Sequence, residues 1–217
     1  MRLPTSLRQL ASRRRHRLGL PFGGACRLRV AQLTAGPLVE FALLFPSARW
    51  NQLTAFAPHV LAGSTADLHR LAIQAQLGIR DLPGVDHGVV ALTECGSQPA
   101  TEDFRNLMWH VFGVPVYELF LDLDGKLIAS ECEAHDGWHI ESMASAFYLF
   151  NGELILDRRM DAVRTGLTGY VETALCPCGR STPRLVALGS ARRAQPRPAS
   201  DERTTVVSPL PLPVRVA

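Results

Sequence analysis

The stretch "TEDFRNLMWHVFG" (101–113), followed at once by "VPVYELFLDL" (114–123), decides the fold class of this chain. Thr101 is of a residue type that caps helix N-termini, and Gly113 is of the type that ends helices. Between them, four apolar residues recur at helical spacing: Phe104, Leu107, Met108 and Val111. The run that follows is almost wholly apolar, as in a buried strand. The stretch therefore predicts a helix that leads directly into a strand.

The same pairing of a helix with a strand stands upstream. "TADLHRLAIQAQLG" (65–78) predicts a helix with Thr65 as its N-cap and Gly78 as its stop. "HGVVALTE" (87–94) predicts a short buried strand. Helices alternating with strands over short connections are typical of a parallel sheet with flanking helices. We therefore expect an α/β core over residues 52–125.

After "DGK" (124–126) the alternation of predicted helices and strands ends. Short strand-like pieces, separated by Gly and Asn turns, replace the alternation: "LIASECE", "WHIESM", "AFYLFNGELILD" and "GYVETAL". This pattern is typical of hairpins and predicts a small β-rich lobe over residues 126–189.

Charge separates the ends of the chain from its middle. Residues 1–39 carry +8 and residues 190–217 carry +3, while the whole chain carries +3, so residues 40–189 carry −8. We expect residues 1–51 to be a basic leader, poorly ordered or partial, and residues 190–217 to be a disordered tail. An acidic middle argues against a nucleic-acid-binding face. Because no apolar run approaches the ~18 residues that a membrane helix needs, we expect no membrane partner and a cytoplasmic protein.

Cysteine and histidine gather in the predicted β lobe. Cys132 is followed by His135 and His139 in "ECEAHDGWHI", and Cys176 and Cys178 stand in "CPCGR". A Cys-x-Cys pair is too tight to close on itself without strain, so its members need another partner. Two knuckles of this kind predict a tetrahedral zinc site.

Three cysteines and one histidine would fill a tetrahedral site, which makes it structural rather than catalytic. His139 is the preferred imidazole because it begins a predicted strand that aims it back at Cys132, whereas His135 lies on the turn; the choice between them stays open. The competing interpretation is that Cys132 is a buried core thiol and that the Cys-x-Cys pair lies in a turn without binding a metal.

Together with "NGELIL" and "RTG", these motifs resemble the closing part of the large domain of phenylacetate–CoA ligase-like proteins, which belong to the adenylate-forming superfamily. The resemblance covers roughly residues 52–188 and extends upstream to "PHVLAGSTADLHRLAIQAQLGI" and "GSQPATEDFRNLMWHVFGVPVYELF". It implies a partial adenylate-forming large domain and a structural Zn²⁺. It also implies descent from enzymes that activate a carboxylic acid with ATP and Mg²⁺ and then form a thioester with CoA.

The resemblance also carries candidate cofactor-binding residues, several of them altered. The family's Gly-x-Glu turn reads Gly96, Ser97 and Gln98, which replaces the carboxylate with an amide. Of the Tyr-Gly-x-Thr-Glu loop only an acid, Asp124, remains. The family's ribose-binding Arg-Thr-Gly-Asp element begins with Arg164 but ends in Leu167 in place of the acid.

Further family elements have no counterpart in the sequence. Nothing in residues 1–51 resembles the phosphate loop, and Lys126, the only lysine, does not match the lysine of the C-terminal lid. Losing one preorganised electrostatic group typically lowers turnover by ~10²–10³. We therefore expect a truncated or divergent ligase that is not self-sufficient in catalysis, and we assign no catalytic residue.

The alternative is a non-catalytic, zinc-stabilised α/β module. The expected partners are a small carboxylic acid or a nucleotide, and a protein that supplies the missing ligase parts; the non-catalytic module would bind a protein partner or a nucleotide-like ligand.

Overall fold

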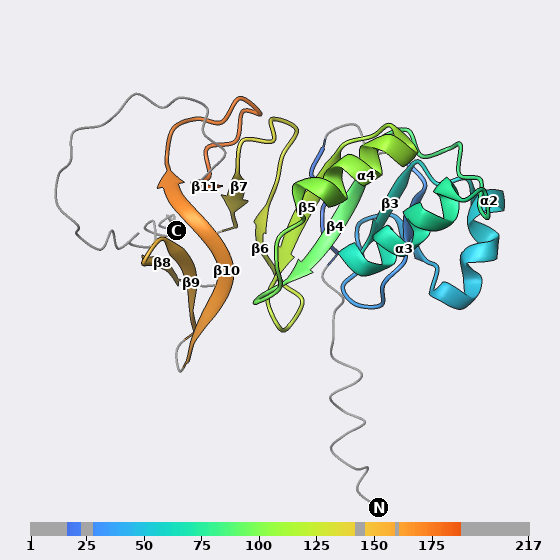
Figure 1. Ribbon diagram of the computed structural model, residues 1–217. Coiled ribbons are helices and arrows are strands. Elements are labelled where there is room, and N and C mark those ends of the chain that lie inside the picture. Colours follow the sequence, from blue (N-terminus) through green and yellow to red (C-terminus); the bar gives the residue numbers. More distant parts are fainter. Residues whose placement is uncertain (1–16, 23–27, 142–145, 159–160, 188–217) are drawn as a thin grey trace, which may run out of the picture.

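The computed structural model describes residues 17–22, 28–141, 146–158 and 161–187, and within them the strands form one sheet of eleven. The strand order is β2-β1-β3-β4-β5-β6-β7-β11-β10-β9-β8. One half of this sheet is parallel and carries the helices, and the other half is antiparallel (Figure 1).

The parallel half alternates strands with helices along the chain. Its elements are β1 (Val30–Gln32), β2 (Ala42–Leu44), the 3₁₀ helix η2 (Ser47–Gln52), α2 (Leu53–Phe56), β3 (Val60–Gly63), α3 (Thr65–Gln76), β4 (Gly88–Glu94), α4 (Glu102–Phe112) and β5 (Val116–Leu121). All neighbouring strands among these five pair in parallel. The predicted helices and strands of residues 65–123 are therefore present in the predicted order.

The two faces of the parallel half are covered differently. Helices α3 and α4 pack on one face, where buried residues such as Leu68, Leu71 and Met108 meet the strands. On the other face the described cover is extended chain that contains Leu18, with Leu20 and Phe22 packed beside it. The prediction of flanking helices is correct in the described residues for one face only.

Helix boundaries follow the capping chemistry. The Thr101 hydroxyl accepts a hydrogen bond from the Phe104 N–H at 3.3 Å, and Gly113 ends α4 in the left-handed region at φ 69°. The predicted cap Thr65 is wrong by one residue. Ser64 is extended, and its hydroxyl accepts from the Asp67 N–H at 3.2 Å, which leaves Thr65 inside the first turn.

Residues 28–51 contribute β1 and β2 to the sheet, whereas the sequence predicted a basic leader, poorly ordered or partial, that ends at residue 51. All three residues of β1 are buried and pair with both β2 and β3, so this strand lies inside the sheet. Trp50 is buried in the helix-side core and its indole N–H donates to the Phe45 carbonyl at 2.9 Å. The predicted leader over 1–16 and 23–27, and the predicted tail over 190–217, lie outside the described residues.

The antiparallel half contains the predicted β-rich region. Its strands are β6 (Leu127–Ser130), β7 (Trp138–Ile140), β8 (Ala146–Phe150), β9 (Glu153–Arg158), β10 (Asp161–Glu172) and β11 (Arg184–Ala187). β6 pairs directly with β5, so this region continues the same sheet. Within the described residues, no helix is long and apolar enough to cross a membrane.

Candidate metal centre

Three neighbouring strands bring four metal-binding side chains together. Cys132 follows the end of β6, His139 lies in β7, and Cys176 and Cys178 lie in the turn between β10 and β11. His139 is paired in register with Ser130 of β6 on one side and with Arg184 of β11 on the other. The ladder therefore places both knuckles beside the same residue of β7.

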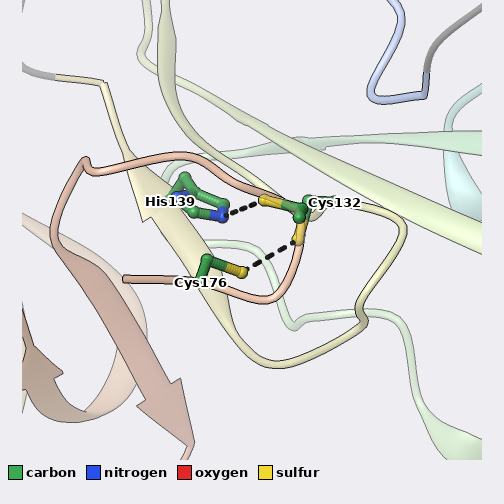
Figure 2. A group of neighbouring side chains, drawn as sticks. Cys132, His139 and Cys176 are labelled. Atoms are coloured by element: carbon green, nitrogen blue, oxygen red, sulfur yellow. Dashed lines mark hydrogen bonds between the residues drawn. The ribbon is translucent and has the colours of Figure 1, made fainter. Parts of the chain in front are cut away.

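The four ligand atoms lie within 4.8 Å of one another. Figure 2 shows His139, Cys132 and Cys176 pointing toward a common centre. The Cys132 and Cys176 sulfurs are 3.6 Å apart, and the Cys178 sulfur lies 3.4 Å from His139 Nε2. The first distance exceeds the ~2.05 Å of a disulfide, so the thiols are free.

The 3.6 and 3.4 Å separations are close to those expected between the ligand atoms of a tetrahedral metal ion. Two sulfurs at ~2.3 Å from a tetrahedral ion lie about 3.8 Å apart, and a sulfur and an imidazole nitrogen lie about 3.5 Å apart. The side chains of Cys132, His139 and Cys176 are buried, and Cys178 is half-buried. Three thiols and an imidazole are the donor set that zinc and other thiolate-binding ions take. This cluster can hold a metal ion, and its four donors would leave no open position.

The turns that carry the cysteines are hydrogen-bonded. The His135 N–H donates to the Cys132 carbonyl, and the Gly179 N–H donates to the Cys176 carbonyl, at 2.9 and 2.8 Å. Gly137 is in the left-handed region at φ 88°, and a Cβ there would collide with the Leu185 carbonyl. Both cysteine turns therefore contain a glycine in the left-handed region, Gly137 and Gly179, and at Gly137 a side chain would not fit.

Ionisation at the site differs from one ligand to the next. Burial raises the pKa of the Cys132 thiol to about 12. At Cys178 burial acts in the same direction, but the Arg180 N–H and the neighbouring thiols outweigh it and lower the pKa. Burial lowers the pKa of His139, which keeps the imidazole neutral and available to a metal. A buried thiolate at Cys132 would need a cation beside it.

Two residues outside the ligand set contact it. The Thr182 hydroxyl lies 2.8 Å from His139 Nδ1 and so leaves Nε2 directed at the Cys178 sulfur. The buried Arg184 guanidinium donates to the Cys176 sulfur at 3.7 Å, and ion pairs with Asp136 and Glu172 hold it in place. The Arg184 guanidinium therefore places an N–H donor beside the Cys176 sulfur, where a metal-bound thiolate would accept it. Sequence reasoning missed both residues, because no local pattern distinguishes them.

His135 lies apart from the four ligands. Its ring stacks on Tyr117 of β5, with ring centroids 4.8 Å apart. Of the two histidines that the sequence left open, the structure groups His139 with the cysteines.

The residues carried over by resemblance lie at the carboxyl ends of the parallel strands. The Gly96 N–H donates to the Thr165 carbonyl at 3.2 Å, so the turn that holds Gly96, Ser97 and Gln98 lies against the β10 bulge that begins at Arg164. Gly166 in that bulge has φ 80°, and a Cβ there would lie 3.3 Å from the Ser97 carbonyl.

Arg164 and Asp124 are placed differently from each other. The exposed Arg164 side chain pairs with Glu153 of β9, and this hydrogen bond lowers the pKa of that carboxyl. Asp124 lies in the turn between β5 and β6, where its N–H donates to the Asp122 carboxylate at 2.8 Å. Leu167, which stands where the family has an acid, is buried.

No family model and no curated protein matches this chain. Solved structures do match it, among them 2-hydroxyisobutyryl-CoA ligase in the postadenylation state, at TM-score 0.57 and 15% identity over 74% of this chain and 42% of the ligase. The same ligase with 2-HIB-AMP and CoA matches at TM-score 0.56 with the same identity and coverage. In an open conformation it matches at TM-score 0.53 and 14% identity, over 73% of this chain and 44% of the ligase.

This chain shares its fold with part of these CoA ligases. It spans less than half of their length. At this identity the likeness establishes the α/β architecture with its large sheet, and nothing about activity.

Proposed function

We propose that Cys132, His139, Cys176 and Cys178 hold a structural Zn²⁺ in a chain descended from acid–CoA ligases of the phenylacetate–CoA ligase-like kind. The observation that carries the proposal is the convergence of four soft donors from three adjacent strands within 4.8 Å of one another. Because no open coordination position remains, the ion would stabilise the fold and would not activate water.

The stabilisation would come from closing a long loop. Cys132 and Cys178 are more than forty residues apart in the chain, and the segment between them contains β7 to β10. Since a preformed site rarely exists in an unfolded chain, the free energy of metal binding adds to the free energy of folding. The thiols must stay reduced to bind, so we place the protein in a reducing compartment such as the cytoplasm.

Metal titration tests this proposal. The chain purified under reducing conditions should contain one zinc, and Co²⁺ added after zinc removal should give the intense visible bands of a tetrahedral thiolate site. A preparation that takes up neither zinc nor cobalt would exclude a metal centre here.

We further propose that a nucleotide or a small carboxylic acid binds at the carboxyl edge of the parallel strands. The support is the contact between the Gly96 turn and the Arg164 bulge, two elements that are far apart in sequence. Ligands of open α/β sheets bind at this edge as a rule.

Turnover is not expected from the chain alone. Gln98 and Leu167 stand where the family has carboxylates, and Leu167 is buried, so that position presents no group to a ligand. ATP, Mg²⁺ and CoA would be used only with a partner protein that supplies further ligase parts; without one, the chain is a zinc-stabilised binding module.

Two assays separate these possibilities. Pyrophosphate release with ATP, Mg²⁺ and aryl or fatty acids should stay at background, and robust release that Asp124→Ala abolishes would show a working ligase. Calorimetry with AMP should show binding that Arg164→Ala weakens, whereas Arg70→Ala, an exposed arginine on α3, should leave it unchanged.

A further inference from the structure

A buried cluster of charges lies where the parallel half meets the antiparallel half. It contains Arg105 on α4, Glu118 on β5 and Glu131, which follows β6 and immediately precedes the ligand Cys132. The Glu118 side chain is fully buried and that of Glu131 is 8% exposed. Charged groups buried to this degree are retained only where hydrogen bonds satisfy them.

Arg105 binds Glu131 with both arms of its guanidinium. One arm donates to Oε2 at 3.1 Å and the other to Oε1 at 2.9 Å. The second arm also donates to Glu118 at 3.3 Å, and the first donates to the Val116 carbonyl at 3.0 Å. A bidentate arginine–carboxylate pair fixes orientation as well as distance.

Besides Arg105, Glu118 accepts hydrogen bonds from two donors and Glu131 from one, so Arg105 supplies a larger share of the bonds to Glu131. The Thr93 hydroxyl and the Ala100 N–H donate to Glu118 at 2.6 and 2.8 Å. Among the described residues, Glu131 forms its ion pair with Arg105. Its further hydrogen bond comes from the Glu118 N–H at 2.8 Å.

The residue before Cys132 is thus fixed through its backbone and its side chain. The Glu131 N–H donates to the Glu118 carbonyl at 2.9 Å, while its carboxylate is held by Arg105. The chain leaves the sheet at the next residue, and that residue offers the first sulfur of the metal centre.

We propose that Arg105 is a positioning residue of the metal centre: through its bidentate pair with Glu131 it sets the place from which Cys132 reaches the ion. The proposal rests on the zinc site proposed above. It makes the affinity for metal depend on helix α4, which carries none of the ligands.

The test measures metal affinity by chelator competition in Arg105→Met, Arg105→Lys and Arg70→Met, with the fold monitored by circular dichroism. Residues that hydrogen-bond to metal ligands typically affect metal affinity 10–100-fold; Arg105 acts through the residue next to a ligand, so Arg105→Met should weaken zinc binding by about tenfold, the lower end of that range. Arg105→Lys keeps the charge but loses the bidentate contact of the guanidinium, so its zinc affinity should lie between those of Arg105→Met and the wild type. Arg70→Met should bind like the wild type.

Two further variants keep the outcome decisive. Leu71→Ala destabilises the parallel half without touching the cluster, and should not change metal affinity while the protein stays folded. If Arg105→Met does not fold, Glu131→Gln, which keeps the shape and removes the charge, should show the weaker affinity and an altered Co²⁺ spectrum. Unchanged affinity and spectrum in these variants would overturn the role of Arg105 and leave the metal site standing. A wild-type chain that binds no metal would overturn both.

Discussion

The two halves of the sheet are stabilised by different means. In the parallel half, β1, β3 and β5 are buried along their whole length, and the helix-side core is made of apolar side chains. In the antiparallel half, the strands that border the metal centre bury a histidine, an arginine and two cysteines beside their apolar residues. Burying such groups costs free energy unless each is paired. The parallel half, whose buried Glu118 is paired with Arg105, should therefore fold without a metal ion, while the antiparallel half should depend on the proposed zinc.

The largest expected effect is that of Cys178→Ser. A serine hydroxyl does not replace a thiolate as a zinc ligand, so the chain should lose its metal and the structure of residues 130–187 should loosen. Elemental analysis and thermal unfolding would measure this. A Cys178→Ser variant that keeps one zinc per chain would contradict the dependence of the antiparallel half on a metal ligand at Cys178.

Leu71→Ala tests the other half. Leu71 is fully buried against the strands, and removing a side chain of this size from a core typically costs about 2–5 kcal/mol. Denaturant unfolding should show a loss in that range, while the folded variant keeps its full zinc content. A loss of zinc in proportion to the loss of stability would mean that the halves are coupled by more than the Arg105–Glu131 pair.

Thr182→Val should have a smaller effect, confined to the antiparallel half. The substitution keeps the shape and removes the hydroxyl that orients His139 through Nδ1. We expect roughly a tenfold weaker zinc affinity, about 1.4 kcal/mol, with little change in the parallel half. An affinity equal to the wild type would show that the imidazole is oriented by packing alone.

The smallest effect should come from His135→Ala. His135 stacks on Tyr117 and is not among the four ligands, so the loss should be that of one aromatic contact, about 0.5–1.5 kcal/mol. Metal content should stay at one zinc per chain. If this variant loses its metal and His139→Ala keeps it, the assignment of the imidazole ligand is wrong.

The sequence predicted the parts of the fold that have a long regular pattern. Residues 65–123 were recognisable because α3 and α4 keep a helical apolar spacing and β4 and β5 are continuous apolar runs. β1 and β2 were missed because strands of three residues have no measurable period and β1 directly follows the arginine-rich segment that ends at Arg29. β1 pairs with β3 and β2 pairs with β1, and no local pattern in the sequence predicts either pairing.

The metal centre, too, was predicted only in part: its ligands were predicted and the residues that support them were not. Its four ligands stand in two short clusters whose residue types and glycine turns are visible in the sequence. Their supports are not, because Thr182 lies 43 residues from His139 and Arg105 lies 26 residues from Glu131. These residues become neighbours only when the chain folds, so the local sequence does not show the pairs.

Hydrogen exchange of the wild-type chain, measured with zinc bound and again after chelation, tests the central claim most directly. We predict that removing zinc raises exchange in β6, β7, β10 and β11 while α3, α4 and β3 to β5 keep their protection. Exchange that does not change on chelation, or that rises equally in both halves, would contradict it.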